Sequence, residues 1–127
     1  MNHPNLLSLN LSATNITYND IKTNAVSLKH NYILQYLDLS ENNISDVGVI
    51  EIANALSVNN TLKSLNISCN LISDEGVSEL VDWLKINYNL TSLFLSENII
   101  GDEGDENLTI LTQELEESNR IIKITWW

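Results

Sequence analysis

Apolar and polar positions along this chain follow one pattern that recurs in four copies. The stretch Leu34–Gly48 reads LQYLDLSENNISDVG, and related stretches begin at Leu62, LKSLNISCNLISDEG, and at Leu90, LTSLFLSENIIGDEG. A weaker copy, LLSLNLSATNITYND, begins at Leu6, so the four first leucines are each separated by 28 residues. Such periodicity predicts a repeat architecture in which every copy is one supersecondary unit.

The start of each repeat predicts a short strand. If positions are counted from the first leucine, then positions one, four and six are leucine or isoleucine in all four copies. Alternation directs positions four and six to a buried face and position five to the opposite face. Position nine is asparagine in three copies, and its amide can bond backbone groups that a turn leaves unpaired. Stacked copies are therefore predicted to form an asparagine ladder of Asn42, Asn70 and Asn98.

The second half of each repeat predicts a helix. Positions thirteen and fifteen are an acid and a glycine in three copies, as at Asp74 and Gly76. We expect the acid to cap the amides of its own helix start and the glycine to allow close packing. Apolar residues then follow at helical spacing, as at Leu80, Val81 and Leu84.

This pattern resembles the leucine-rich repeat family, specifically its ribonuclease-inhibitor type, whose repeat has the same length. The consensus LxxLxLxxNxIxDxGxxxLAxxLxxN is met almost in full by Leu34–Asn59 and by Leu62–Asn87. The resemblance implies an α/β fold, a right-handed solenoid forming a horseshoe segment, with a concave parallel β-sheet and convex helices. The residues agree, because no repeat can bury its apolar face alone and stacked neighbours close a continuous core.

The whole chain, residues 1–127, is expected to be one leucine-rich repeat domain of about four and a half repeats. The repeats start near residues 6, 34, 62 and 90, and a terminal strand lies near 121–127. The favoured frame of that strand starts at Ile121 and turns Ile124 inward; the alternative frame starts at Ile122.

The two end repeats depart from the pattern. In the first, Tyr18 stands at the place of the acid, and a helix is expected over about residues 20–30. The fourth repeat is three residues longer, and we place the extra residues at 105–107. Trp83 is expected to be partly buried between helices, and a convex partner site is the alternative.

The acidic composition of the chain limits the classes of molecule that it is expected to bind. The chain has 6 lysines and arginines against 17 aspartates and glutamates, so its net charge is −11. That charge repels phosphate backbones and anionic membranes and attracts basic proteins, so neither nucleic acid nor membrane is predicted as a partner. The start lacks a basic leader, and no apolar run approaches the roughly 18 residues of a membrane span. Together with the single Cys69, these features predict a cytoplasmic protein.

Residues suited to catalysis or metal binding are sparse. His3 and His30 have no nucleophile placed beside them by the repeat, and Cys69 has no adjacent base. The acids of residues 102–107 lack the spacing of a calcium loop and suit the start of a helix. We therefore predict no enzyme activity, no cofactor and no metal site.

Side chains that face the concave side without a core role are the candidates for recognition. Tyr36 and Phe94 are aromatic, the class enriched at binding hot spots, and they lie two repeats apart with Lys63 and Asn66 between them. The predicted partner-binding set is Tyr36, Asp38, Glu41, Lys63, Asn66, Phe94 and Glu97.

The main functional hypothesis is a protein-interaction module that binds a protein partner through its concave sheet. An alternative is a structural solenoid that pairs, as a homodimer, through its open ends, with Trp126 and Trp127 as an association surface. By analogy of fold alone, a third is a non-catalytic regulator of an enzyme such as a GTPase or nuclease.

A last stretch bears on localisation. The segment QELEES, Gln113–Ser118, resembles the glutamate-rich export signals of bacterial effectors that act inside a host cell. The other interpretation is the solvated face of the last helix.

Overall fold

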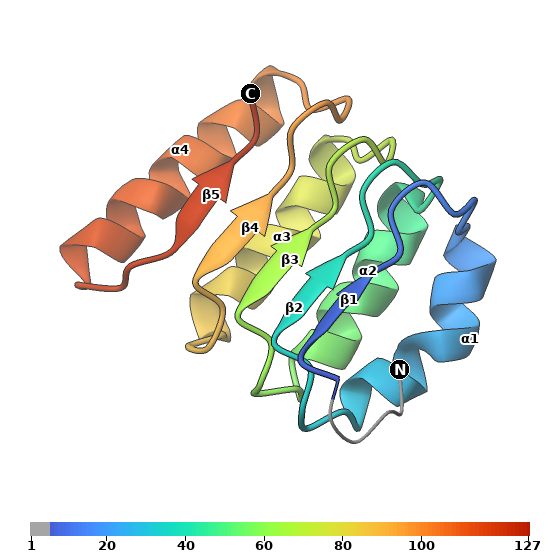
Figure 1. Ribbon diagram of the computed structural model, residues 1–127. Helices are drawn as coiled ribbons and strands as arrows, with labels where there is room; N and C mark the ends of the chain where they lie inside the picture. Colours follow the sequence, from blue (N-terminus) through green and yellow to red (C-terminus); the bar gives the residue numbers. More distant parts are fainter. Residues whose placement is uncertain (1–5) are drawn as a thin grey trace.

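A computed structural model describes residues 6–127, in which five short strands alternate with four helices (Figure 1). The strands are β1 (Ser8–Asn10), β2 (Tyr36–Asp38), β3 (Ser64–Asn66), β4 (Ser92–Phe94) and β5 (Lys123–Thr125). The helices are α1 (Tyr18–Lys29), α2 (Ser45–Leu56), α3 (Asp74–Ile86) and α4 (Asp102–Glu117). The strands are parallel and adjacent in chain order, and the helices form a layer on one side of the sheet (Figure 1). The predicted α/β solenoid is thus confirmed, and the sheet face turned away from the helices is its concave face.

The register of the sheet follows from the period of the sequence. Leu37, Leu65 and Leu93 pair in one row across neighbouring strands, and all three are buried. Burying a leucine side chain stabilises a fold by roughly 1.5–3 kcal/mol, so this row of leucines stabilises the contacts between neighbouring repeats. Ile124 pairs with Leu93 in the same row, and β5 therefore has the frame that starts at Ile121.

The three ladder asparagines join each turn to that of the preceding repeat. Asn70 is 0% exposed; its Nδ2 donates to the carbonyl oxygen of Leu39 at 2.9 Å, and its Oδ1 accepts from the Ile44 N–H at 3.2 Å. Asn42 and Asn98 make equivalent bonds to the repeats before them. Asn70 thus gives the buried Ile44 N–H its acceptor, and it shares the Leu39 carbonyl oxygen with the Asn42 amide.

The acids at position thirteen do not cap their own helices, so that prediction was wrong. Oδ1 of Asp46 accepts from the N–H of Ser73 at 2.8 Å, and Oδ1 of Asp74 accepts from the N–H of Gly101 at 2.7 Å. Ser73 and Gly101 are the N-cap residues of α3 and α4. Each carboxylate therefore stabilises the helix of the next repeat, near the positive end of its dipole.

The first repeat has no such carboxylate, and the backbone at the start of α2 differs from that at the starts of α3 and α4. Tyr18 occupies the place of the acid, and Ser45, the equivalent of Ser73 and Gly101, has a φ of 61°. Its N–H donates to the carbonyl oxygen of Asn70 at 2.9 Å. The left-handed backbone at Ser45 therefore gives this amide an acceptor in the next repeat.

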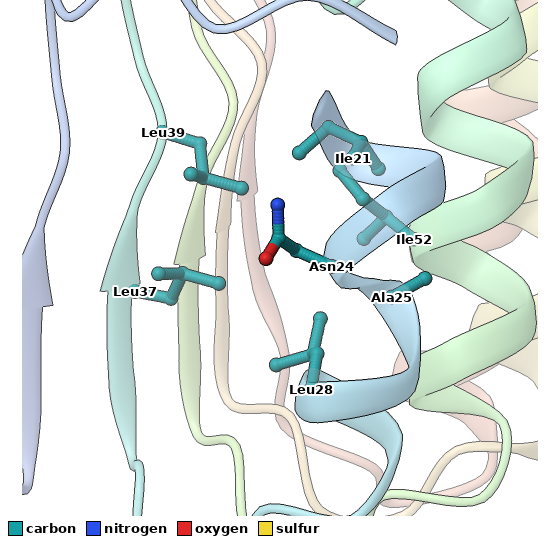
Figure 2. A pocket seen from close by; sticks show the side chains of 7 residues that line it. All are labelled: Ile21, Asn24, Ala25, Leu28, Leu37, Leu39 and Ile52. Carbon is teal, nitrogen blue, oxygen red and sulfur yellow. The ribbon is translucent and has the colours of Figure 1, made fainter. Parts of the chain in front are cut away.

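The N-terminal end of the core is incompletely filled. The first helix begins at Tyr18, two residues before the expected start, because Thr17 and Asp20 form a capping box. Asn24 stands where the other helices have Ile52, Leu80 and Leu108, all fully buried. Figure 2 shows the Asn24 carboxamide directed into a small hollow, whose apolar lining is Ile21, Ala25, Leu28, Leu37, Leu39 and Ile52.

The extra residues of the fourth repeat lengthen its helix. α4 has 16 residues and α3 has 13, and the two helices begin at equivalent acids, Asp102 and Asp74. Since α4 runs without a break, the additional turn lies at its C-terminal end, and the predicted insertion at 105–107 was wrong. Leu108 therefore takes the helical place of Leu80.

Arg120 closes the last repeat. Its Nη2 donates to the carbonyl oxygens of Leu84 and Asn87, and its guanidinium lies 4.2 Å from the centroid of the Tyr88 ring. In the second repeat the Asn59 amide donates to the corresponding pair of carbonyls. In the last repeat an arginine thus donates to the two carbonyl oxygens that an asparagine side chain bonds in the second repeat.

Two apolar residues lie differently from the prediction. Ile121 is 90% exposed, whereas the first leucine of the preceding repeat, Leu90, is buried; Ile122 packs against the core in its place. Trp83 is 4% exposed, so it is a core residue and offers no convex partner site.

Candidate partner-binding face

Two rows of side chains cross the concave face from strand to strand. The row at position five comprises Asn10, Asp38, Asn66, Phe94 and Thr125. The row at position three comprises Ser8, Tyr36, Ser64, Ser92 and Lys123. Neighbouring strands are about 4.8 Å apart, so β2 and β4, which carry Tyr36 and Phe94, are separated laterally by roughly 10 Å, and the two residues lie in different rows.

Position five has a structural role that the sequence interpretation missed. The side-chain oxygens of Asn10, Asp38 and Asn66 each accept from the N–H of the serine two residues later, at 2.9, 2.9 and 3.1 Å. Such local bonds support the turn at the end of each strand. The sequence pattern that indicates this turn bond is an aspartate or asparagine two residues before a serine, and it occurs in three repeats. Phe94 departs from it, because its ring has no acceptor.

A hollow opens on the concave face between the two aromatic residues. It is lined by Ser8, Leu9, Asn10, Tyr36, Leu37, Asp38, Ser64, Asn66 and Phe94. Tyr36 is 49% exposed, and Asp38, Asn66 and Phe94 are half-buried. Four of the seven predicted partner-binding residues therefore meet in one place, together with Ser8, Asn10 and Ser64, which were not in the predicted set.

The other three predicted residues lie outside this hollow. Glu41 and Glu97 are exposed and follow β2 and β4, at the carboxyl edge of the sheet. Both have left-handed φ values, 54° and 57°, a conformation that costs non-glycine residues of order 1 kcal/mol. Lys63 is exposed and precedes β3, at the amino edge. The concave side is thus polarised, with carboxylates at one edge and a lysine at the other.

The C-terminal tryptophans lie at the end of the solenoid. Trp126 is partly buried against the core, and its Nε1–H donates to Oδ1 of Asp105 at 2.8 Å. Trp127 is 79% exposed and packs edge-to-face on Trp126, with ring centroids 5.2 Å apart. Trp126 therefore helps to cover the end of the core, and Trp127 presents its ring to solvent.

The described part of the chain offers little for other classes of site. His30 is the C-cap residue of α1, near the amino edge of the sheet, whereas Cys69 follows β3 at the carboxyl edge. His3 lies outside the described residues. Within residues 6–127 no group of three or more histidine, cysteine, aspartate or glutamate side chains is arranged to hold a metal ion. No helix of this range is long and apolar enough to cross a membrane.

Comparison with known proteins identifies one family. The family model described as "Leucine Rich repeat" matches residues 30–53, 58–81 and 87–108, which is more than half of the chain. A search of curated protein sequences finds no match.

Solved structures of two other proteins share the fold. One is described as "Leiomodin-1 Actin-Binding Site 2 (ABS2)"; it has a TM-score of 0.85 and 23% identity over 99% of this chain and 73% of that one. The other is the tropomodulin C-terminal domain of Caenorhabditis elegans, with a TM-score of 0.76 and 15% identity over 96% of this chain and 74% of that one. At these identities the likeness is one of fold.

Proposed function

Because the chain belongs to the leucine-rich repeat family, we propose that it is a non-catalytic protein-interaction module that binds a protein partner through its concave face. The observation that carries this proposal is the hollow in which Tyr36, Asp38, Asn66 and Phe94 meet. Aromatic side chains on a solvent-facing sheet have no core role and are enriched at binding hot spots. Strands that hold these side chains in place reduce the ordering cost of association.

The test is affinity capture from an extract of the native host with wild-type protein and with the double variant Tyr36→Ala/Phe94→Ala. The proposal expects a partner whose capture falls at least about tenfold with the double variant, because hot-spot aromatics each contribute about 1–2 kcal/mol or more. Circular dichroism must show that the variant is folded. Unchanged capture by the folded double variant contradicts the proposal.

A matched control removes apolar side chains elsewhere. Tyr32 and Ile86 are 71% and 65% exposed and lie outside the sheet, one before β2 and the other at the end of α3. Tyr32→Ala/Ile86→Ala should leave capture unchanged, because it deletes comparable area away from the concave face. Equal losses with both double variants would point to a non-specific effect and contradict the assignment of the site.

Actin is a specific candidate partner, because one similar structure carries an actin-binding site in its description. Co-sedimentation with actin filaments and gel filtration with monomeric actin test it directly. Co-migration that is lost with Tyr36→Ala/Phe94→Ala supports actin as the partner of the concave face. An absence of co-migration removes actin and leaves other proteins, including an enzyme such as a GTPase or nuclease that the module would regulate.

Self-association through the ends is a second candidate function. The exposed ring of Trp127 and the outer edge of β5 favour it, because an unpaired edge strand can accept another chain. Light scattering across a range of concentrations distinguishes the two states. A dimer that Trp127→Ala dissociates supports this function, and a concentration-independent monomer contradicts it.

Export as a bacterial effector is a proposal about localisation. Glu114, Glu116 and Glu117 are all exposed on the last turns of α4, where an export receptor can reach them. Their exposure equally suits a solvated helix face, since Glu114 forms a 3.8 Å ion pair with Lys85. A translocation reporter fused to the chain tests export; a signal that is unchanged when the three glutamates become alanine contradicts the role of this stretch. Without export, the protein is proposed to be cytoplasmic.

A further inference from the structure

We infer that the concave hollow receives a cationic side chain, specifically an arginine, presented by the protein partner. This inference rests on the proposed function, because it specifies the chemistry that the same face recognises. It is drawn from the shape of the hollow, from its single charged residue and from the two aromatic rings beside that residue.

The shape of the hollow follows from the two rows. Ser8 and Ser64 pair with Tyr36 from either side, so small side chains flank the tyrosine ring and leave space next to it. In the other row Asn66 separates Asp38 from Phe94. A side chain entering from the solvent thus meets an aromatic ring on each side of the opening and a carboxylate within it.

The charge of the hollow is unbalanced. Asp38 is the one charged residue among the nine that line it. Its Oδ1 accepts from the N–H and the Oγ–H of Ser40, but no residue in the described range donates to its Oδ2. The ion pair found in residues 6–127 is Lys85–Glu114, so no lysine or arginine of that range neutralises Asp38. A partner that covers the hollow must therefore donate to Oδ2 of Asp38 or leave a carboxylate oxygen buried and unpaired, which is costly, and a cationic donor also compensates the charge.

The residues that line the hollow favour one class of partner side chain over the others. An anionic group is repelled by Asp38 and by the net charge of −11. An apolar side chain would desolvate the carboxylate without compensating it. Arginine suits the hollow better than lysine, because its planar guanidinium stacks on aromatic faces and also pairs with a carboxylate.

The first experiment is an NMR titration of the isotope-labelled protein with a capped peptide, acetyl-Gly-Gly-Arg-Gly-Gly-amide. The matched probe replaces arginine by citrulline, which keeps the shape and removes the charge. The inference expects the arginine peptide to shift the amide signals of Tyr36, Asp38, Asn66 and Phe94, and the citrulline peptide to bind at least about fivefold more weakly. Equal binding of the two peptides, or shifts confined to other surfaces, overturns it.

Two charge variants sharpen the result. Asp38→Asn removes the charge and keeps the turn bond, since Asn10 and Asn66 make that bond with an amide. Glu79→Gln removes one charge from an exposed position of α3, away from the concave face. The preference for arginine over citrulline should disappear in Asp38→Asn and persist in Glu79→Gln. Persistence in both variants, or loss in both, overturns the inference.

The failure of this inference is distinguishable from that of the proposed function. Partner capture that survives Asp38→Asn but is lost with Tyr36→Ala/Phe94→Ala overturns the arginine inference and leaves the concave binding face standing. Capture that survives all of these substitutions overturns both. Capture lost with Asp38→Asn and retained with Glu79→Gln supports both.

Discussion

Oδ1 of Asp46 lies 2.3 Å from the point where a Cβ atom on Gly76 would be. The carboxylate reaches across one repeat to the N-cap amide of α3, and the missing side chain of Gly76 provides the room. Asp74 and Gly104 repeat the arrangement one turn of the solenoid later, at 2.5 Å. The acid and the glycine therefore serve the interface between neighbouring repeats.

The first prediction concerns this pair. Gly76→Ala should destabilise the fold by about 1–3 kcal/mol, because the new methyl group displaces the Asp46 carboxylate. The same substitution should cost less in an Asp46→Ala background, although Ile72 still lies 2.8 Å from the added atom. Urea unfolding of the double-mutant cycle measures the coupling.

A control for this cycle exists in the second repeat. A Cβ on Gly48 would meet the side chain of Ile44 at 2.3 Å and no carboxylate. Gly48→Ala should therefore show no relief when Asp46 becomes alanine. Strictly additive costs for Gly76→Ala and Asp46→Ala would show that the two residues do not share the space.

The second prediction concerns the asparagine ladder. Asn70→Ala should cost about 1–3 kcal/mol, because it leaves the buried Ile44 N–H without an acceptor and removes one of the two donors to the carbonyl oxygens of Leu39 and Ser68. Leu65→Ala, which empties a core site, should cost about 2–5 kcal/mol and is the reference. Chemical denaturation compares them. A cost for Asn70→Ala below about 1 kcal/mol would contradict the role of the ladder.

The third prediction concerns the N-terminal hollow of Figure 2. Asn24→Leu should stabilise the fold by about 1 kcal/mol, because an apolar side chain then packs on the apolar lining of the hollow in place of an exposed amide that donates to the Asp20 carbonyl oxygen. Asn19→Leu, on an exposed position of α1, controls for helix propensity and should have little effect. Thermal unfolding measures both, and a destabilised Asn24→Leu variant would contradict the packing account.

The fourth prediction concerns Arg120. Arg120→Ala should destabilise the C-terminal repeat by about 1–3 kcal/mol, because the carbonyls of Leu84 and Asn87 lose a charged donor and Tyr88 loses its stacking partner. Arg120→Lys should recover little of this, since an ammonium group lacks the planar fork. Hydrogen exchange at the end of α3 is the measurement; unchanged protection in Arg120→Ala would exclude the proposed closure.

Much of the fold was predictable because the residues that build it recur in each copy of the repeat. The leucines represented by Leu37 and the ladder asparagines represented by Asn70 recur at fixed positions, and recurrence reveals which residues build the interfaces between repeats. The register of β5 also followed, since Ile124 had to continue the row of Leu93. Periodicity in the sequence therefore predicts a contact well when the same contact is made between several pairs of repeats.

Two kinds of contact were not predicted from the sequence: those that occur once, and repeated ones for which the pattern does not name the partner. Arg120 acts on carbonyl oxygens that precede it by more than 30 residues, and no repeat period places it there. The acid of each repeat was assigned to its own helix because local capping is the commoner use, whereas stacking brought it next to the following one. At the concave face, aromatic character pointed to Tyr36 and Phe94, whereas the turn bond made by Asp38 was missed although its pattern recurs at Asn10 and Asn66.

The most direct test of the concave binding face is a hydrogen-exchange footprint of the protein with and without its captured partner. Binding through the concave face should slow exchange at the strand ends and following turns, over residues 36–41, 64–68 and 92–97. The exposed turns of α2 and α3 should exchange at the same rate in both states. Protection confined to the helices, with these three segments unchanged, would show that the partner binds the convex side and not the concave face.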